Sequence, residues 1–223
     1  PATQQNPLTV RFENIEKQFQ EYPGLIYDGP FSDHMEKMEP QGLTGPEINV
    51  EQGKEKASRF LGTERIQSIE NAGVNDGNIK AFTYQAVLKG APKGIVVTTE
   101  ITRKGGHPLW MVYNRPVSEA KLDVEQAKAA ARAFLEKNGF NNMADSYYIK
   151  EDNVATINYA YTQDDVIIYP DLIKVKVALD NGEIVGFESR GYLMSHKRRD
   201  INTPLLSEEQ ARAKINPSLG VAS

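Results

Sequence analysis

The stretch LDVEQAKAAARAFL, from Leu122 to Leu135, is nearly repeated upstream by INVEQGKEKASRFL, from Ile48 to Leu61. When Ile48 is aligned with Leu122, half of the aligned positions are identical. A weaker third copy, LLSEEQARAKI, runs over residues 205–215. Recurrence of this kind indicates a repeated structural module rather than a single functional helix.

Each copy carries the signature of a helix N-terminus. Asn49, Asp123 and Ser207 each stand three residues before a Gln, as in a capping box that satisfies free backbone N–H groups. In the second copy, apolar residues at helical spacing form one stripe, made up of Val124, Ala127, Ala131, Phe134 and Leu135. We therefore expect three helices, with Phe60 and Phe134 as equivalent anchors, each buried against its own sheet.

The sequence after the first two helices alternates with period two, as in a half-buried antiparallel sheet. The apolar stripes are Phe82, Tyr84, Ala86 and Leu88; Ile157, Tyr159 and Tyr161; and Ile173, Val175, Val177 and Leu179, with Lys174 and Lys176 on the opposite side. Three dipeptides, Asp76-Gly77, Gly105-Gly106 and Asn181-Gly182, can supply the positive φ of tight turns. The predicted fold class is α+β, with tandem modules that each pack one helix on a three- or four-stranded antiparallel sheet.

The repeats also define the expected domain organisation. Residues 1–46 form an N-terminal helix plus an extended segment, 47–118 the first module and 119–197 the second, and 198–223 a linker with the start of a truncated third module. Because such modules have thin cores, adjacent copies are expected to pack on one another or on a partner. The chain opens at Pro1, and the third helix copy is not followed by strands, so we expect a piece of a longer protein.

Composition excludes several classes of function. The chain has 223 residues, of which 39% are hydrophobic and 25% charged, enough for a substantial core. A net charge of -4 disfavours nucleic acid as a partner, because such binding depends on clustered Lys and Arg. The absence of Cys excludes disulfides and thiolate metal sites, and no apolar run reaches the roughly 18 residues of a membrane span.

The residues that could carry catalysis are few. His34, His107 and His196 are far apart in sequence, and no nucleophile or phosphate-binding motif is present. Three carboxylate pairs could flank a glycosidic bond: Glu36 with Glu39, Asp164-Asp165 and Glu208-Glu209. A loop or a helix first turn explains the last two pairs better. We therefore expect no catalytic residues, no metal, no cofactor and no enzyme activity.

Two segments resemble a known family. A capped helix headed by VEQAK, followed by strands ending in KVKVALDNGEIVGFES, is similar to the PepSY module. The stretch YPGLIYDGPFSDH, from Tyr22 to His34, resembles the C-terminal region of the spore germination YpeB family. In the first module, RKGGHPLWMVYN replaces the acidic hairpin found at residues 180–183.

The resemblance implies a function without chemistry. It implies a spore protein that retains the cortex-lytic enzyme SleB, with peptidoglycan as a further possible partner. The full-length protein would be anchored in a membrane by a segment absent here. Its location would be extracytoplasmic, at the outer face of the inner membrane or in the cortex region. Two alternatives stay open, a peptidase inhibitor or intramolecular regulator and a peptidoglycan-acting hydrolase.

Three segments are candidates for contact with a partner. The first is YDGPFSDH, which is either a structural corner or a docking surface, with Tyr27, Asp28, Phe31, Asp33 and His34 as candidate partner-binding residues. The second is an aromatic group that we expect to be mostly core or cross-strand pairs, with an exposed platform as the alternative: Trp110, Tyr113, Tyr147, Tyr148, Tyr159, Tyr161 and Tyr169. The third is the basic run HKRRD over 196–200, expected to be a solvated linker, with a docking patch as the alternative.

Overall fold

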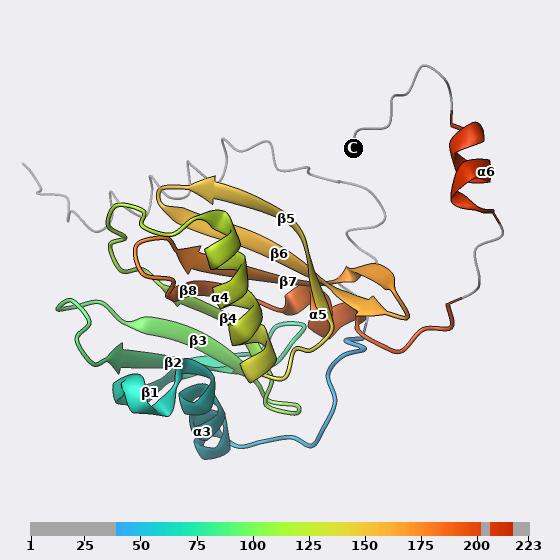
Figure 1. Ribbon diagram of the computed structural model, residues 1–223. Helices are drawn as coiled ribbons and strands as arrows, with labels where there is room; N and C mark the ends of the chain where they lie inside the picture. The colour runs from blue at the N-terminus through green and yellow to red at the C-terminus, as the bar shows by residue number, and fades with distance from the viewer. Residues whose placement is uncertain (1–38, 202–205, 216–223) are drawn as a thin grey trace, which may run out of the picture. The chain divides into compact units, whose positions relative to one another are not determined.

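Two copies of one arrangement, a helix followed by four antiparallel strands, make up most of the described chain (Figure 1). The computed structural model describes residues 39–201 and 206–215. The first copy consists of α3 (Val50–Leu61), β1 (Ile66–Asn75), β2 (Ala81–Leu88), β3 (Val97–Thr102) and β4 (Pro108–Tyr113). The second consists of α4 (Val124–Lys137), β5 (Met143–Glu151), β6 (Val154–Gln163), β7 (Val166–Ala178) and β8 (Ile184–Glu188), followed by α5 (Arg190–Ser195). The α+β class predicted from the sequence is confirmed.

All three expected helix N-termini carry a complete capping box. The Asn49 side chain accepts a hydrogen bond from the Gln52 backbone N–H at 2.9 Å, and the Gln52 side chain accepts from the Asn49 N–H at 3.0 Å. The same reciprocal bonds start α4 at Asp123 and the short helix α6 (Glu208–Ala213) at Ser207. Glu209 therefore lies in a helix first turn, as predicted.

The two copies share one continuous sheet. The strand order is β1-β2-β3-β4-β8-β7-β6-β5, so the last strand of one copy pairs with the last strand of the other. This antiparallel β4–β8 seam contains three residue pairs: Trp110 with Glu188, Met111 with Phe187, and Val112 with Gly186. Backbone pairing thus joins the two copies edge to edge, and residues of both copies belong to one core cluster.

The repeat extends to how each helix is attached. The backbone N–H of Ile48 donates to the carbonyl of Arg103 at 2.8 Å, and that of Leu122, its aligned counterpart, donates to the carbonyl of Leu179 at 2.9 Å. In both copies, therefore, the chain leading into the helix is fixed to the hairpin between that copy's third and fourth strands. In the first copy, φ of 77° and 67° at Gly105 and Gly106 lets this hairpin turn tightly.

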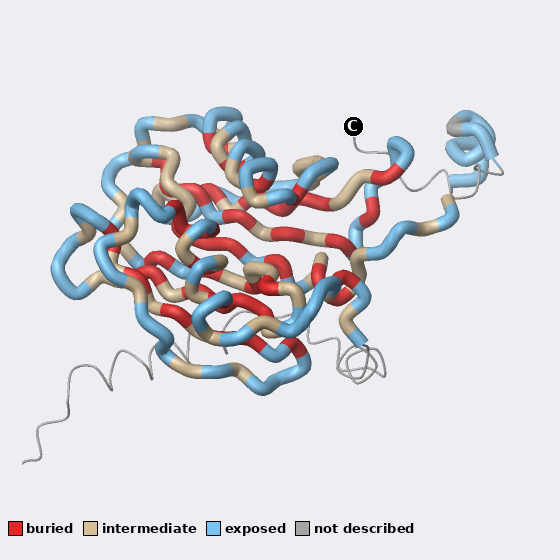
Figure 2. The backbone as a smooth tube through the Cα atoms, turned by 90° about the horizontal axis from the view of Figure 1, so that it is seen from below, coloured by how far each residue is buried: buried red, intermediate tan, exposed pale blue. Residues whose placement is uncertain are grey.

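Both long helices cover the same face of the sheet (Figure 1). The strands carry most of the buried residues (Figure 2). Two fully buried tyrosines tie helix to sheet: the Tyr84 hydroxyl donates to the Val50 carbonyl at 2.7 Å, and the Tyr159 hydroxyl donates to the Lys128 carbonyl at 2.9 Å. Burial raises the pKa of both hydroxyls to about 12. The opposite, open face carries no long helix among the described residues.

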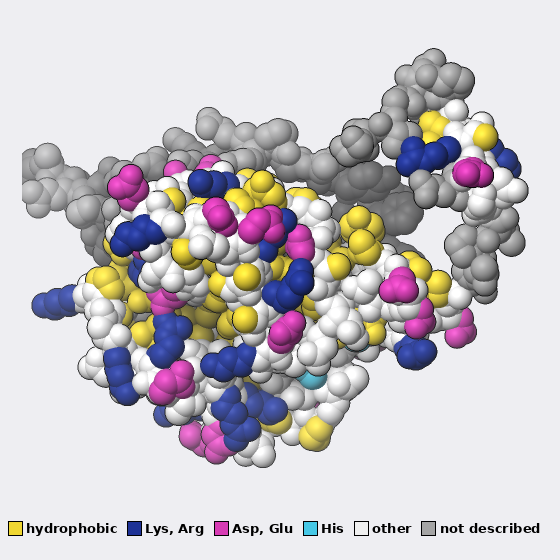
Figure 3. All heavy atoms as spheres, viewed as in Figure 1, with side chains coloured by type: hydrophobic (Ala, Val, Ile, Leu, Met, Phe, Trp, Pro, Cys, Tyr) yellow, Lys and Arg dark blue, Asp and Glu magenta, His cyan; other side chains and the backbone are white. Residues whose placement is uncertain are grey.

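Phe60 and Phe134 pack on each other rather than each on its own sheet, which corrects the expectation from the sequence. Their ring centroids lie 5.4 Å apart in an edge-to-face arrangement, and both also contact Phe187 of β8, at 5.1 and 5.8 Å. Phe134 is only half-buried. A small cavity of about 80 Å³ lies beside this trio, and Figure 3 shows apolar side chains in the hollow between the helices.

The turns agree with prediction at two of three sites. Gly105-Gly106 and Gly182 have positive φ, but neither Asp76 nor Gly77 does. The Asn75 side chain instead accepts the Gly77 N–H at 2.9 Å, and this side-chain bond turns the longer β1–β2 loop.

The expectation of a solvated linker at residues 196–200 is wrong for His196 and Arg199. The Arg199 guanidinium donates to both oxygens of Asp171 at 2.8 and 2.7 Å, and Nδ1 of His196 lies 2.9 Å from the same carboxylate. Asp171 is fully buried, and a buried carboxylate needs such partners. The exposed Lys197, Arg198 and Asp200 alone fit the expected solvated run.

The described helices were also tested as membrane spans. None of those within residues 39–201 and 206–215 combines the length and hydropathy needed to cross a bilayer.

The aromatic trio generates a stability prediction. Phe60→Ala should cost about 3 to 5 kcal/mol, the usual range for a buried Phe, and the half-buried Phe134 should cost less. Because the rings touch, a double-mutant cycle should give a coupling of about 0.5 to 1.5 kcal/mol. Urea unfolding of the two single variants and the double variant measures it.

A matched control uses Leu193, which lies in a separate core cluster. Phe60→Ala and Leu193→Ala should be additive. Equal additivity for the Phe60 and Phe134 pair would contradict packing between the copies.

Candidate binding groove

The open face of the sheet presents two continuous rows of side chains across the seam. Cross-strand pairs place the members of a row side by side on one face. The first row consists of Glu100, Trp110, Glu188, Lys174, Asn158 and Tyr147, and the second of Thr98, Val112, Gly186, Lys176, Thr156 and Ile149. Both rows run from β3 to the edge strand β5, so both copies contribute to one surface.

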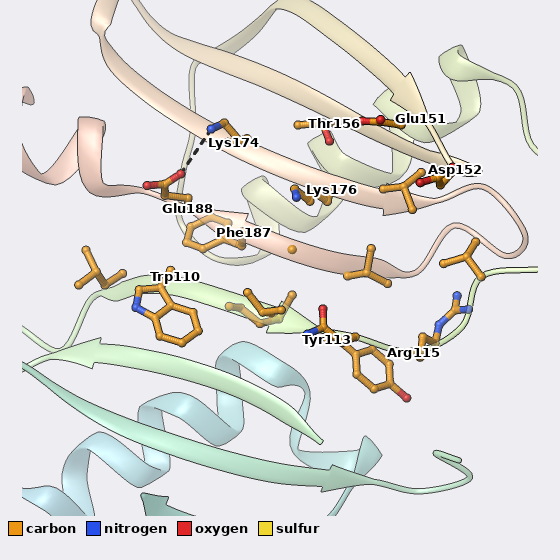
Figure 4. Close-up of a pocket in the computed structure, with 18 of the residues that line it drawn as sticks. Trp110, Tyr113, Arg115, Glu151, Asp152, Thr156, Lys174, Lys176, Phe187 and Glu188 are labelled. Atoms are coloured by element: carbon orange, nitrogen blue, oxygen red, sulfur yellow. Dashed lines mark ion pairs between the residues drawn. The ribbon is translucent and has the colours of Figure 1, made fainter. Parts of the chain in front are cut away.

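A groove of about 550 Å³ lies over these rows (Figure 4). We define the open-face groove by the lining residues that stand on this face at the seam: Trp110, Val112, Lys174, Lys176, Gly186 and Glu188. Arg190 of α5 lines it as well, as do Glu151 and Asp152 at the β5–β6 turn. The volume falls within the range of small-ligand and peptide sites.

Charged side chains in the groove differ in how they are neutralised. Lys174 and Glu188 form an ion pair at 3.5 Å, with both side chains nearly half exposed (Figure 4), so the pair contributes little stability. Lys176 and Arg190 form no ion pair within the described residues. The groove therefore offers two uncompensated cations to a ligand.

Gly186 shapes the floor of the groove. A Cβ atom built there would lie 2.9 to 3.0 Å from the Lys176 side chain, so the aliphatic part of that lysine rests directly on the glycine backbone. Beside it stand the half-buried Trp110 and the exposed Val112. An apolar area beside cations is typical of a recognition surface, where an aromatic ring and a charge can contact the same partner.

One end of the groove is fixed by Arg115, from the segment between the copies. Its guanidinium donates to both oxygens of Asp180 at 2.8 Å and to Glu183 at 2.6 Å. Arg65 of the first copy also pairs with Glu183. The acidic hairpin that distinguishes the second module thus binds cations from the linker and from the first module.

This cluster shifts the acid–base behaviour of its members. The hydrogen bonds from Arg115 lower the pKa of Asp180 from its ordinary 3.8 to about 2, and they raise the pKa of Arg115 itself. Burial, followed by the nearby Glu183 charge, raises the pKa of Tyr113. The Arg115 and Asp180 side chains are 10% and 9% exposed, so the pair is shielded from solvent and contributes more than a surface ion pair.

The residues singled out from the sequence are distributed as follows. Tyr27, Asp28, Phe31, Asp33 and His34 lie outside the described residues, as do Glu36 and the expected helix near residues 10–22. Asp164-Asp165 form a two-residue turn between β6 and β7 with φ of 50° and 62°, as the loop assignment predicts. Within the described part, no three His or acidic residues gather where a metal could bind.

The prediction that most of the aromatic residues are core or cross-strand pairs agrees with the structure, since Tyr147 and Tyr148, though exposed, lie opposite Asn158 and Ile157 on β6. Tyr113 and Tyr159 are buried and Tyr161 is half-buried, but Tyr147, Tyr148 and Tyr169 are 56%, 48% and 59% exposed. Trp110 and Tyr113 lie on opposite faces of β4. Sequence reasoning did not identify Lys176, Gly186 or Arg115 as site residues. Gly186, beside Lys176, meets Val112 only across the seam, and Arg115 meets Asp180 from a distant part of the chain.

The described lining of the groove presents few of the groups that commonly carry covalent catalysis. Its described lining includes no Ser, His or Cys, and its carboxylates are Glu188, which is paired with Lys174, and the neighbours Glu151 and Asp152 at the turn. A nucleophile with a base in hydrogen-bond reach is the usual minimum for such catalysis.

Comparisons with known proteins point to one family. The family model for YpeB sporulation proteins, covering their PepSY1 and PepSY2 domains, matches residues 8–202. A sporulation protein YpeB of Bacillus subtilis is 32% identical over 97% of this chain and 48% of its own length, and one of Halalkalibacterium halodurans is 31% identical over 89% and 43%. The chain thus spans less than half the length of these relatives.

A solved structure is also similar. The Bacillus megaterium YpeB C-terminal domain superposes with a TM-score of 0.70 at 26% identity, covering 80% of this chain and 79% of that one. The similarity extends over both copies of the repeat.

The Arg115 cluster predicts a specific acid sensitivity. Because the folded-state pKa of Asp180 is lowered, its contribution is present above the unfolded value of 3.8 and is lost as pH falls toward about 2. The stability difference between the native chain and Asp180→Asn should therefore shrink between pH 5 and about pH 2, which urea unfolding across that range measures. A constant difference would contradict the assigned ion pair.

The same cluster predicts a contrast between two arginines. Arg115→Ala at neutral pH should cost about 3 kcal/mol, because it leaves the largely shielded Asp180 carboxylate without its ion-pair partner. Arg59→Ala, which removes an exposed ion pair with Glu55 at 3.6 Å, should cost less than about 1 kcal/mol. Similar losses of unfolding free energy in the two variants would contradict a larger contribution from Arg115.

Proposed function

Because the chain belongs to the YpeB family of sporulation proteins, through its PepSY1 and PepSY2 domains, we propose that it is a non-catalytic interaction module. Its role is to retain and stabilise the cortex-lytic enzyme SleB in the dormant spore until germination. The proposal places the longer protein outside the cytoplasm, anchored at the outer face of the inner membrane or in the cortex region. Peptidoglycan is a possible second partner.

The open-face groove is the observation that carries the proposal. It joins strands of both copies, combines Trp110 with the uncompensated Lys176 and Arg190, and leaves their side chains available to a ligand. Lys176 and Arg190 are exposed and form no ion pair with the described residues, whereas the half-buried Trp110 also packs on the second core cluster. Such residues are typical hot spots of protein interfaces.

Retention of a partner needs only binding. A module that binds the native enzyme and not its unfolded form stabilises it by RT ln(1 + [L]/Kd), about 2.7 kcal/mol at a ligand concentration of 100 Kd. That amount is a large fraction of the stability of an ordinary domain. No catalytic group is required for this protection.

The test combines a binding measurement with spores. Trp110→Ala with Lys176→Glu should weaken binding of the purified cortex-lytic enzyme about tenfold or more, because an aromatic anchor is lost and a charge is reversed. Spores carrying the same changes in the longer protein should retain less enzyme. Unchanged circular dichroism and melting must first show that the variant folds.

A control variant separates the groove from surface changes in general. Val74 of β1 is 58% exposed and lies outside the groove lining, so Val74→Ala should leave retention normal. Normal retention of the cortex-lytic enzyme by the folded groove variant would contradict the proposal for this surface. In that case Phe31→Ala with His34→Ala tests the YDGPFSDH segment, which stays a predicted contact.

Turnover and inhibition assays separate the alternatives. The purified chain should release no fragments from cortex peptidoglycan, and it should not slow a peptidase. Turnover that survives further purification would favour the hydrolase, and stoichiometric inhibition would favour the inhibitor.

A further inference from the structure

The edge strand β5 ends in a regular segment whose first three residues are large, hydrophobic and exposed. Residues 147–151 follow a bulge between Asp145 and Tyr147 and pair without interruption to β6. Tyr147, Tyr148 and Ile149 are consecutive and 56%, 48% and 57% exposed. Natural edge strands are usually blunted by bulges, charges or a covering element, and a bare segment of this kind indicates an interface.

The opposite edge of the sheet is blunted. β1 contains two register shifts, between Ile66 and Ser68 and between Asn71 and Gly73. Among the described residues of β1, only Val74 is both large and hydrophobic and exposed. The two edges therefore differ, and only β5 offers a flat template for another strand.

The backbone of β5 determines which groups are free. Asp152 and Asn153 have φ of 47° and 60°, which makes a two-residue turn flanked by the pair Glu151 and Val154. Such a turn closes with hydrogen bonds between its flanking residues, and bonded pairs then alternate along the hairpin. The N–H and C=O groups of Tyr148 and Lys150 therefore point away from β6. No hydrogen bond from the described residues outside the sheet reaches them.

We infer that β5 pairs with β5 of a second copy of this chain, antiparallel and centred on Ile149. In this register the free groups of Tyr148 face those of Lys150 of the second copy, and the reverse, which makes four hydrogen bonds about a two-fold axis. Ile149 meets its own counterpart on the axis as a non-hydrogen-bonded pair.

The side chains are complementary in the same register. On the open face Ile149 meets Ile149 of the second copy, with Tyr147 beside Glu151 of the second copy. On the helix face Tyr148, whose ring lies 5.4 Å from Lys128 Nζ, stands opposite Lys150 of the second copy. No like charges face each other. A register centred on Tyr148 would instead bring the bulge at Ser146 opposite Lys150.

The size of the contact sets its strength. A five-residue strand pair lies below the roughly 1,200 Å² of a stable interface, so the dimer is weak and concentration-dependent. The two-fold axis stands perpendicular to the sheet, which puts the open faces of both copies on one side. The dimer does not depend on the proposed function, but it would place two open-face grooves on the same side of the assembly.

Cysteine scanning tests the register, because the native chain has no Cys. Cα atoms of a non-hydrogen-bonded pair lie about 4.5 Å apart, within the range that a disulfide spans. Ile149→Cys should therefore give a covalent dimer under mild oxidation. Lys150→Cys should not, because diagonal neighbours lie about 7 to 8 Å apart. Val74→Cys, equally exposed on β1, is the matched control and should stay monomeric.

Sedimentation equilibrium gives a second readout without a thiol. The native chain should shift from one chain to two with increasing concentration. Ile149→Lys should abolish the shift by placing two ammonium groups on the axis, and Val74→Lys should leave it unchanged. A native chain that stays monomeric, or equal crosslinking at positions 74 and 149, would overturn the inference.

Discussion

The structure depends on the pairing of β4 with β8. These strands are the last of their copies, and three residue pairs join two four-stranded sheets into one. Each face of that seam is then used differently. On the helix face Phe60 and Phe134 meet over Phe187, and on the open face Trp110 and Val112 adjoin Glu188 and Gly186 to form the groove. At one end Arg115 holds the hairpin that leads into β8.

The single sheet also determines what is left for interactions. Two separate modules would expose four strand edges, whereas the joined sheet exposes only β1 and β5. The two long helices cover one face, which leaves the exposed residues of the other face and of the β5 edge available for contacts. A protein whose role is to hold a partner can use such surfaces without any reacting group, because protection by binding follows from mass action alone.

Local features could be predicted from the sequence because their physics is local. A capping box needs residues three apart, and the alternation from Ile173 to Leu179 reports one buried face, so the helices, the strands and the fold class follow directly. The seam could not be predicted in this way, since nothing in the repeat indicates which strand of one copy pairs with which strand of the other.

The same limit applies to the side chains of the candidate site. Asp171 follows Pro170 in an irregular part of β7, and its burial depends on Arg199, which looks like part of a solvated basic run in the sequence. Arg115 reads as an ordinary linker residue until the acidic hairpin is brought to it. Lys176 shares the outward side of its strand with Lys174, and only the glycine beneath it and the lack of an acidic partner distinguish it.

The central claim is that the two copies form one unit. Calorimetric unfolding tests it most directly, because independent modules melt separately, whereas one cooperative unit gives a calorimetric enthalpy equal to its van't Hoff enthalpy. Fluorescence of the single Trp, at position 110 in the seam, and far-ultraviolet circular dichroism provide two further probes. We predict one transition, with an enthalpy ratio near one and coincident curves from both probes. Two resolved transitions, or loss of the Trp110 signal before the secondary structure melts, would contradict the account.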